Sequence, residues 1–174
     1  ASMLIPGSGT GASTGAPASL YPSPIVASGL PTAGATVASV SINGFNHTWP
    51  DDVDIVLVSP SGQSVILMSD VGGSTDAVNL NYTFNDAAAS LMADNALNPS
   101  GSYRPTNFGT GDNWPAPGPG GAPTATTLST FTGNLNGTWN LYVVDDLGGD
   151  AGSLTGGWSI SFNTPAPVIF TPNT

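Results

Sequence analysis

The chain has 174 residues and a mass of 17.3 kDa, which suits a single domain. Its 11 acidic residues are all Asp, and with one Arg and no Lys they give a formal net charge of −10. Binding to nucleic acids and to anionic membranes depends on clustered Lys and Arg, so the composition excludes both. No apolar run is long enough for a membrane span, and the absence of Cys rules out disulfides and thiolate metal sites.

Composition also favours a β protein over a helical one. Helical proteins use Glu and Lys freely on their surfaces, and this chain has neither. It has 23 Gly and 16 Pro, which indicate many turns, while 39% of its residues are apolar, enough for a folded core. An acidic surface without Lys and rich in Ser, Thr, Asn and Gly favours a secreted protein, extracellular or at the cell surface.

The predicted elements begin with an apolar patch at residues 3–5, which can form a strand. The Gly/Ser/Thr/Ala-rich run that follows, up to residue 19, is interpreted as a loop or linker. Prolines in residues 20–26 favour an edge or entry segment. Residues 36–42 alternate with period two, as a half-buried strand does, and Asn43-Gly44 signals a turn after it.

The clearest element is a hairpin. Residues 52–58 and 63–68 are two strands, and the Ser-Pro-Ser-Gly sequence of residues 59–62 is the tight turn between them. Residues 86–93 are the one predicted helix, with Asn85 or Asp86 as its N-cap.

The second half of the chain predicts a long Pro/Gly loop over residues 98–127, which its aromatic residues should pack against the fold. Residues 138–144 and 157–162 are two further strands, joined by an Asp/Gly loop, and an apolar segment lies near the C-terminus. Many short strands predict an all-β fold: an antiparallel β-sandwich (jelly roll) with at most one short helix. The predicted organisation is an N-terminal strand and flexible segment at 1–19, the sandwich at 20–164 and a tail at 165–174.

Aspartates gather at the open end of the hairpin. If the turn centres between Ser61 and Gly62, paired positions sum to about 123, which places Asp54 near Ser69. Alternation then puts Asp52 and Asp54 on one face, with Asp70 beside them. Carboxylates at such distances repel each other, and a hard divalent cation with oxygen ligands removes the repulsion.

A second group occupies the loop of residues 145–152. Asp145, Asp146 and Asp150 lie in a Gly-rich stretch that can wrap an ion, although its spacing matches no EF-hand. Ca²⁺ is preferred to Mg²⁺, which requires near-ideal octahedral geometry, and to Zn²⁺, which prefers His or Cys. The alternative is that Asp residues beside Gly simply cap turns. That alternative is favoured for four aspartates that lie apart from the hairpin group, which begins at Asp51, and from the loop group: Asp76, Asp86, Asp94 and Asp112.

Three stretches resemble the P domain that follows the catalytic domain in kexin- and furin-like proprotein convertases. Residues 46–62 resemble its H-T-x-x-x-D-L-x-v-x-L-x-S-P-x-G stretch, and residues 137–143 its G-x-W-x-L-x-V stretch. Residues 145–160 are similar to the bacterial ending D-x-x-x-G-D-x-G-x-L-x-x-W-x-L. The resemblance implies a jelly-roll sandwich, found in many secreted bacterial proteins, in which Asp52, Asp145 and Asp150 are family positions compatible with calcium binding. The 98–127 insertion and Asp54 depart from the family pattern.

No catalytic constellation is expected. His47 is the only histidine, no G-x-S-x-G elbow is present, and we interpret His47 as a structural residue bonded to a neighbouring turn. Paired aspartates in polar Gly-rich loops lack the apolar pocket that a glycosidase acid requires. The P domain of convertases is likewise separate from the domain that carries their catalytic residues.

The sequence therefore predicts a non-catalytic, extracellular, calcium-binding sandwich with a structural or adhesive role. Short apolar strands at both ends (residues 3–5 and 168–170) allow self-association into a homopolymer by strand addition, or pairing within their own sheet. The alternative is an accessory P domain that stabilises a secreted subtilisin-like protease or other hydrolase. A weaker alternative is a carbohydrate-binding module that uses Trp49 or Trp114.

Overall fold

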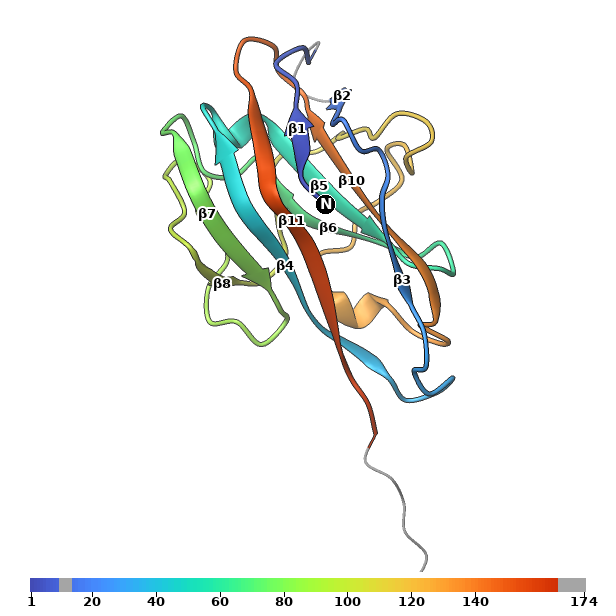
Figure 1. Ribbon diagram of the computed structural model, residues 1–174. Coiled ribbons are helices and arrows are strands. Elements are labelled where there is room, and N and C mark those ends of the chain that lie inside the picture. Colours follow the sequence, from blue (N-terminus) through green and yellow to red (C-terminus); the bar gives the residue numbers. More distant parts are fainter. Residues whose placement is uncertain (10–13, 166–174) are drawn as a thin grey trace, which may run out of the picture.

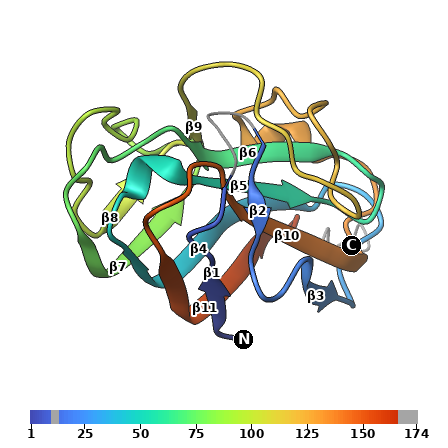
Figure 2. The same ribbon diagram turned by 90° about the horizontal axis from the view of Figure 1, so that it is seen from above.

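The computed structural model describes residues 1–9 and 14–165, which fold into two β-sheets packed face to face. The first sheet has the strand order β1-β11-β4-β7-β8 and the second β2-β10-β5-β6-β9, with β3 also pairing with β10. Viewed from above, β5 and β6 lie in one layer and β4, β7 and β11 in the other (Figure 2). The predicted all-β sandwich is confirmed.

The elements of the first sheet are long where they cross the core and short at its edges (Figure 1). Its strands are β1 (Met3–Ile5), β4 (Thr36–His47), β7 (Ala77–Phe84), β8 (Gly101–Tyr103) and β11 (Gly152–Asn163). The strands of the second sheet are β2 (Ala16–Pro17), β3 (Ser23–Ala27), β5 (Val53–Val58), β6 (Ser64–Ser69), β9 (Thr106–Asn107) and β10 (Gly137–Asp145).

Most strand pairs are antiparallel, but β6–β9 and β7–β8 are parallel, so both sheets are mixed rather than purely antiparallel. Both parallel partners lie within residues 98–127, which the sequence predicted to be a loop without strands. The described part of the chain contains no helix with the length and apolar character needed to cross a membrane.

The predicted helix over residues 86–93 is wrong. Its N-cap candidate, Asp86, instead accepts hydrogen bonds from the backbone N–H groups of Leu128 (2.7 Å) and Ser129 (2.8 Å). These residues begin the 3₁₀ turn η2 (Leu128–Thr130), so Asp86 caps a turn 42 residues away. The segment after Asp86 is held by bonds to other loops, including Arg104 N–H to the Ser90 carbonyl (2.9 Å).

The turn predicted at Asn43-Gly44 is also wrong, because β4 runs through it. Gly44 has a φ of 66°, and the pairing of β4 with β7 shifts register between Ile42 and Phe45. The glycine therefore forms a β-bulge, in which the left-handed conformation is available without a Cβ clash. The bulge bends a long strand instead of ending it.

The core lies between the sheets and is built mainly from alternate positions of the long strands. Val53, Ile55 and Leu57 of β5 face it, as the alternation predicted, and Trp139 of β10 is fully buried in it. A second apolar cluster lies on the outer face of the second sheet, under the segment that follows β9. Its buried residues are Val56, Ile66, Trp114, Tyr142 and Val144.

We predict that Gly44→Ala lowers the free energy of unfolding by about 2–3 kcal/mol. The new Cβ meets the Thr155 hydroxyl and a left-handed backbone, and an L-residue in that conformation costs roughly 1–2 kcal/mol before any clash. Gly62→Ala is the matched control, because Gly62 also has a positive φ (84°) but open space around it. Urea unfolding should therefore show a larger loss for Gly44→Ala, and equal losses would contradict the packing described for the bulge.

Candidate metal centre

Nearly all the aspartates lie at one end of the sandwich. We define them as one group because each of them repels, or is repelled by, at least one other carboxylate of the group. The group contains every Asp except Asp76 and Asp86: Asp51, Asp52, Asp54, Asp70, Asp94, Asp112, Asp145, Asp146 and Asp150.

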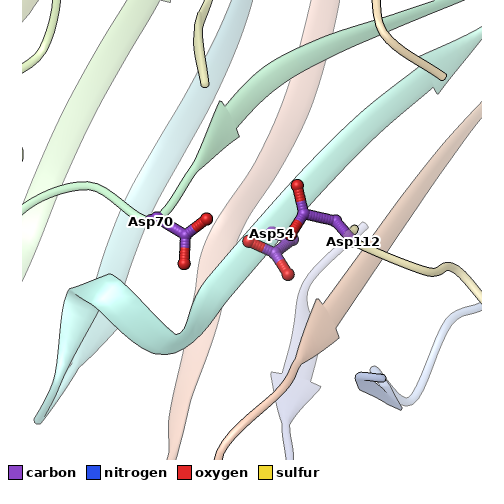
Figure 3. Close-up of side chains that lie close together, drawn as sticks. All are labelled: Asp54, Asp70 and Asp112. Carbon is purple, nitrogen blue, oxygen red and sulfur yellow. The ribbon is translucent and has the colours of Figure 1, made fainter. Parts of the chain in front are cut away.

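Three of these carboxylates meet on the outer face of the second sheet (Figure 3). One oxygen from each of Asp54, Asp70 and Asp112 lies within 4.8 Å of the others. Asp54 is 1% exposed and Asp112 6% exposed, and Asp70 is half-buried. Asp54 Oδ2 is buried and has no hydrogen-bond partner.

Ser69 lies at the centre of this triad. Its Oγ is 2.8 Å from Asp54 Oδ1, 2.9 Å from Asp112 Oδ2 and 3.4 Å from Asp70 Oδ2. A hydroxyl has one proton, so it can donate to only one of the three carboxylates at a time. The remaining close oxygen–oxygen contacts are repulsive unless a carboxyl proton or a cation lies between them.

The β5–β6 hairpin places Asp54 and Asp70. Near the turn, Val58 pairs with Ser64 and Val56 with Ile66. Further from the turn, a bulge between Val56 and Ile55 shifts the register by one residue. That shift brings Asp54 to Ser69, as the sequence predicted. Asp70 follows β6 with a φ of 51°, a conformation that Asp tolerates better than most residues and that ends the strand at the triad.

Asp112 is supplied by the loop that follows β9. Two residues later Trp114 is fully buried against Val56 and Ile66 in the outer apolar cluster. Tyr21 packs on this cluster and donates its hydroxyl proton to the Pro115 carbonyl (2.8 Å). The buried Trp114 therefore fixes the loop over the sheet and holds Asp112 above Asp54.

Asn107 is a further candidate ligand that sequence reasoning missed. It is the parallel-ladder partner of Ser69, so both side chains lie on the same face of the sheet. Its side-chain Oδ1 is buried and has no hydrogen-bond partner. An amide oxygen on the same face as Ser69 is a neutral candidate for an all-oxygen ligand set.

Burial and mutual repulsion both favour the protonated form of these carboxyls. Burial raises the pKa of Asp54 well above its usual value, with smaller increases from Asp146, Asp112 and Asp70, against a lowering by the Ser69 hydroxyl. Burial, then Asp112, raises the pKa of Asp70 to about 6. Burial also raises the pKa of Asp112. The triad is thus unfavourable in its fully ionised form when no cation is present.

A second acidic group lies on the core side of the same sheet end. Asp145 ends β10 and is fully buried, and its Oδ2 lies 3.0 Å from His47 Nε2 on the opposite sheet. His47 Nδ1 lies 2.7 Å from the Trp49 carbonyl oxygen, so this histidine bonds the neighbouring turn. Burial, then Asp145, raises the pKa of Asp52 to about 6.

Asp146 lies between the two groups. Its backbone N–H donates to the Asp52 carbonyl (2.9 Å), which fixes the end of β10 beside the start of β5. Burial, then Asp70, Asp52 and Asp112, raises the pKa of its carboxyl to about 7. Its charge is therefore felt on both faces of the sheet.

The sequence placed Asp54 and Asp70 together, and the structure does so as well. Asp52 lies apart from them, because it belongs to the 3₁₀ turn η1 (Pro50–Asp52) and strand alternation begins only at Val53. Asp112 joins the triad although the sequence favoured turn capping for it. Asp145 and Asp52 share the core-side group, and Asp150 contributes its charge to Asp52.

Comparison with known families identifies part of the chain. Residues 36–103 match the proprotein convertase P-domain, which confirms that resemblance over β4 to β8. The P domain is a non-catalytic accessory domain of proteases and is typical of secreted ones. The match includes Asp52, Asp54 and Asp70 but ends before Asp112. No curated protein matches the chain.

We predict that without calcium the protein becomes less stable as pH rises from about 4 to about 7. A carboxyl whose pKa is higher in the folded than in the unfolded state stabilises the folded state at low pH. This stabilisation is lost as pH rises through the folded-state pKa, which is about 6 for Asp70 and about 7 for Asp146. The loss should exceed about 1 kcal/mol, since one unit of pKa shift corresponds to about 1.4 kcal/mol. Urea midpoints across this pH range measure it.

The matched variants are Asp54→Asn, which removes a carboxylate of the triad, and Asp76→Asn, which removes an exposed one. Asp54→Asn should flatten the pH profile and Asp76→Asn should leave it unchanged. A calcium-free protein whose stability rises steadily from about pH 4 to 7 would contradict the repulsion described here.

Proposed function

We propose that this chain, whose residues 36–103 match a P-domain, is a calcium-stabilised, non-catalytic module of a secreted protein with a structural or adhesive role. The observation that carries the proposal is the Asp54–Asp70–Asp112 triad. The carboxylates of Asp70 and Asp112 lie close to that of Asp54, whose buried Oδ2 has no hydrogen-bond partner, in a chain with a single Arg and no Lys.

The ligand set fits Ca²⁺. Calcium binds oxygen ligands at about 2.3–2.6 Å, so two ligands on opposite sides of one ion are about 4.8 Å apart. The ligand oxygens of the triad lie within that separation of one another. The Asn107 amide oxygen and the Ser69 hydroxyl are neutral oxygen donors on the same face. Zinc prefers His or Cys, and the triad contains neither.

Bound calcium would act by joining segments that are distant in sequence. Asp54 belongs to β5, Asp70 follows β6, and Asp112 belongs to the loop anchored by Trp114. An ion held by all three cross-links the hairpin to this loop and removes the repulsion between their carboxylates. Such a site stabilises the fold without performing chemistry, as expected of an accessory or structural module.

We predict that saturating Ca²⁺ raises the melting temperature by roughly 5–10 °C at about pH 7.5. A ligand at 100 times its Kd contributes about 2.7 kcal/mol, and each kcal/mol shifts the melting temperature by about 2–4 °C in a protein of this size. The effect should fade below about pH 6, where protons compete for the same carboxylates. Differential scanning calorimetry with Ca²⁺ and with a chelator measures both.

Variants locate the effect. Asp112→Asn should abolish most of the calcium-dependent increase, while Asp86→Asn, which removes the cap of η2, should lower the melting temperature equally with and without Ca²⁺. Equal melting temperatures for the wild-type protein in Ca²⁺ and in chelator would remove calcium from the proposal.

A second candidate function is favoured by the P-domain match: an accessory domain that folds beside a secreted protease or other hydrolase and stabilises it. An antibody raised against this chain separates the two. In the natural producer, a secreted band near 17.3 kDa supports a separate structural subunit. A larger band that carries hydrolase activity supports the accessory domain.

Self-association through the terminal strands stays a prediction. Residues 3–5 pair with β11, and the other edge of β1 is occupied too, because Leu4 N–H donates to Ser19 Oγ and Ser19 N–H to the Leu4 carbonyl (both 2.9 Å). Residues 168–170 lie outside the described residues.

Carbohydrate binding is the weakest candidate. Trp114 is fully buried, so only Trp49, which is 41% exposed, can stack on a sugar. A glycan array without signal would dispose of this alternative.

A further inference from the structure

We propose that the open edge of β11, at residues 158–161, binds residues 168–171 of a second copy of this chain as an added strand. The inference assigns a surface to the predicted self-association. It goes beyond the proposed calcium site and does not depend on it.

Most of β11 has a neighbouring strand on one side only. β4 pairs with it as far as Asn163, whereas β1, on the other side, pairs only with residues 152–154. Ala1 lies against Gly157, so the place beside Gly157 is filled. Among the described residues, none pairs with residues 158–161 along the edge opposite β4. An unpaired edge without Pro or charged residues is a template for strand addition.

An apolar groove lies beside this edge. β3 borders the second sheet on the side where β1 pairs with β11 (Figure 1), and the groove between β3 and β11 has a volume of about 270 Å³. Its lining includes five half-buried apolar side chains that pack on the rim of the core: Ile25, Ala27, Leu30, Ile160 and Phe162. Apolar surface beside an open edge favours an added strand with apolar side chains.

The edge of β3, on the other side of the groove, is less suitable for pairing. Pro24 lies within β3 and has no backbone N–H to donate. Residues 158–161 of β11 are Trp-Ser-Ile-Ser, without Pro or Gly. Their pairing with β4 is regular, and the register shifts only after Ser161. Four consecutive residues of β11 therefore present a regular edge.

Residues 168–171 supply a strand of matching length. Their sequence, Val-Ile-Phe-Thr, has high β propensity. Pro172 follows it and Pro167 precedes it, so these four residues form an uninterrupted run of backbone N–H groups. Alternate side chains of an added strand face the same way, so Val168 and Phe170 would cover the groove while Ile169 would face outward beside Ser159.

The start of this segment favours a second copy over the chain's own β11. Thr36 pairs with Asn163, and a Cβ on Gly34 would lie 2.8 Å from Pro165 Cγ, so Pro165 continues the line of β11 on the β4 side. To cover its own edge, the chain must reverse direction after Pro165. The Pro-Ala-Pro sequence of residues 165–167 disfavours that reversal, because a residue before Pro avoids the αR region and no Gly is available for a positive φ.

The distribution of charge also favours this contact. Two copies of a chain with a net charge of −10 repel each other unless neutral surfaces meet. All 11 Asp lie within residues 51–150, as does the single Arg, so residues 1–50 and 151–174 contain no Asp, Glu, Lys or Arg. The groove, the edge of β11 and residues 168–171 all belong to these uncharged segments. Because the two contact surfaces differ, the contact is heterologous and can propagate into a chain of subunits.

The first test is the mass of the full chain in solution, measured by sedimentation velocity over a range of concentrations. We expect assemblies larger than 17.3 kDa that grow with concentration. Phe170→Asp should raise the dissociation constant roughly tenfold or more, as the loss of an interface anchor does. Asn173→Asp is the matched control, because it adds the same charge outside residues 168–171 and should leave the association unchanged.

Cysteine cross-linking locates the contact, since the chain has no Cys of its own. When Ser159→Cys protein is mixed with Ile169→Cys protein that carries a mass tag, oxidation should produce a disulfide-linked heterodimer on a non-reducing gel. Asp76→Cys is the control. Asp76 is exposed at the start of β7, which β4 separates from β11, so this variant should not form the heterodimer.

Three results would overturn the proposal. They are a chain that is monomeric at every concentration, an association that Phe170→Asp leaves unchanged, and an association without the heterodimer. A Ser159→Cys/Ile169→Cys double variant that closes its disulfide within monomers would also overturn it, and would show that the segment covers its own β11. Melting temperatures in Ca²⁺ and in chelator test the calcium site separately, so either proposal can fail without the other.

Discussion

Repulsion between buried carboxylates is the constraint on which this structure depends. A 174-residue chain with 11 Asp, one Arg and no Lys cannot neutralise its acidic groups with its own side chains. The fold nevertheless collects nine of them at one end of the sandwich and buries several. Such an arrangement is stable only when protons or bound cations compensate the charge, and at neutral pH a cation is the more effective of the two.

The hairpin and the approach of Asp54 to Ser69 were predictable from local sequence. Period-two alternation and the Ser-Pro-Ser-Gly turn fix β5 and β6, and their register brings Asp54 to Ser69. Near the turn the paired residue numbers sum to 122, one less than the predicted 123. A bulge between Val56 and Ile55 changes the sum to 123, so that Asp54 lies opposite Ser69 as predicted. The prediction therefore succeeded at Asp54 partly because of a bulge that no sequence pattern indicated.

Asp112 and Asn107 were not predictable in the same way. Both lie in a Pro/Gly-rich segment without periodicity, and Asp112 is 58 residues from Asp54, so only the tertiary fold brings them together. The buried Trp114 is the residue that places this segment. The helix prediction failed for the same reason, since Asp86 caps a turn 42 residues away rather than its own segment. A capping residue in the sequence indicates that its side chain can accept hydrogen bonds from the first N–H groups of a helix or turn. It does not indicate which helix or turn in the fold provides them.

The P-domain match and the acidic triad overlap only in part. The match covers β4 to β8, which form much of the sandwich, and it ends before the segment that carries Asp112. The hairpin lies inside the matched region, while the segment after it supplies the third carboxylate and the Trp114 anchor. An ion that joins the two would make the stability of the hairpin depend on the segment that carries Asp112. In the structure itself, the burial of Trp114 and the hydrogen bond from Tyr21 to the Pro115 carbonyl hold this long Pro/Gly-rich segment against the sheet.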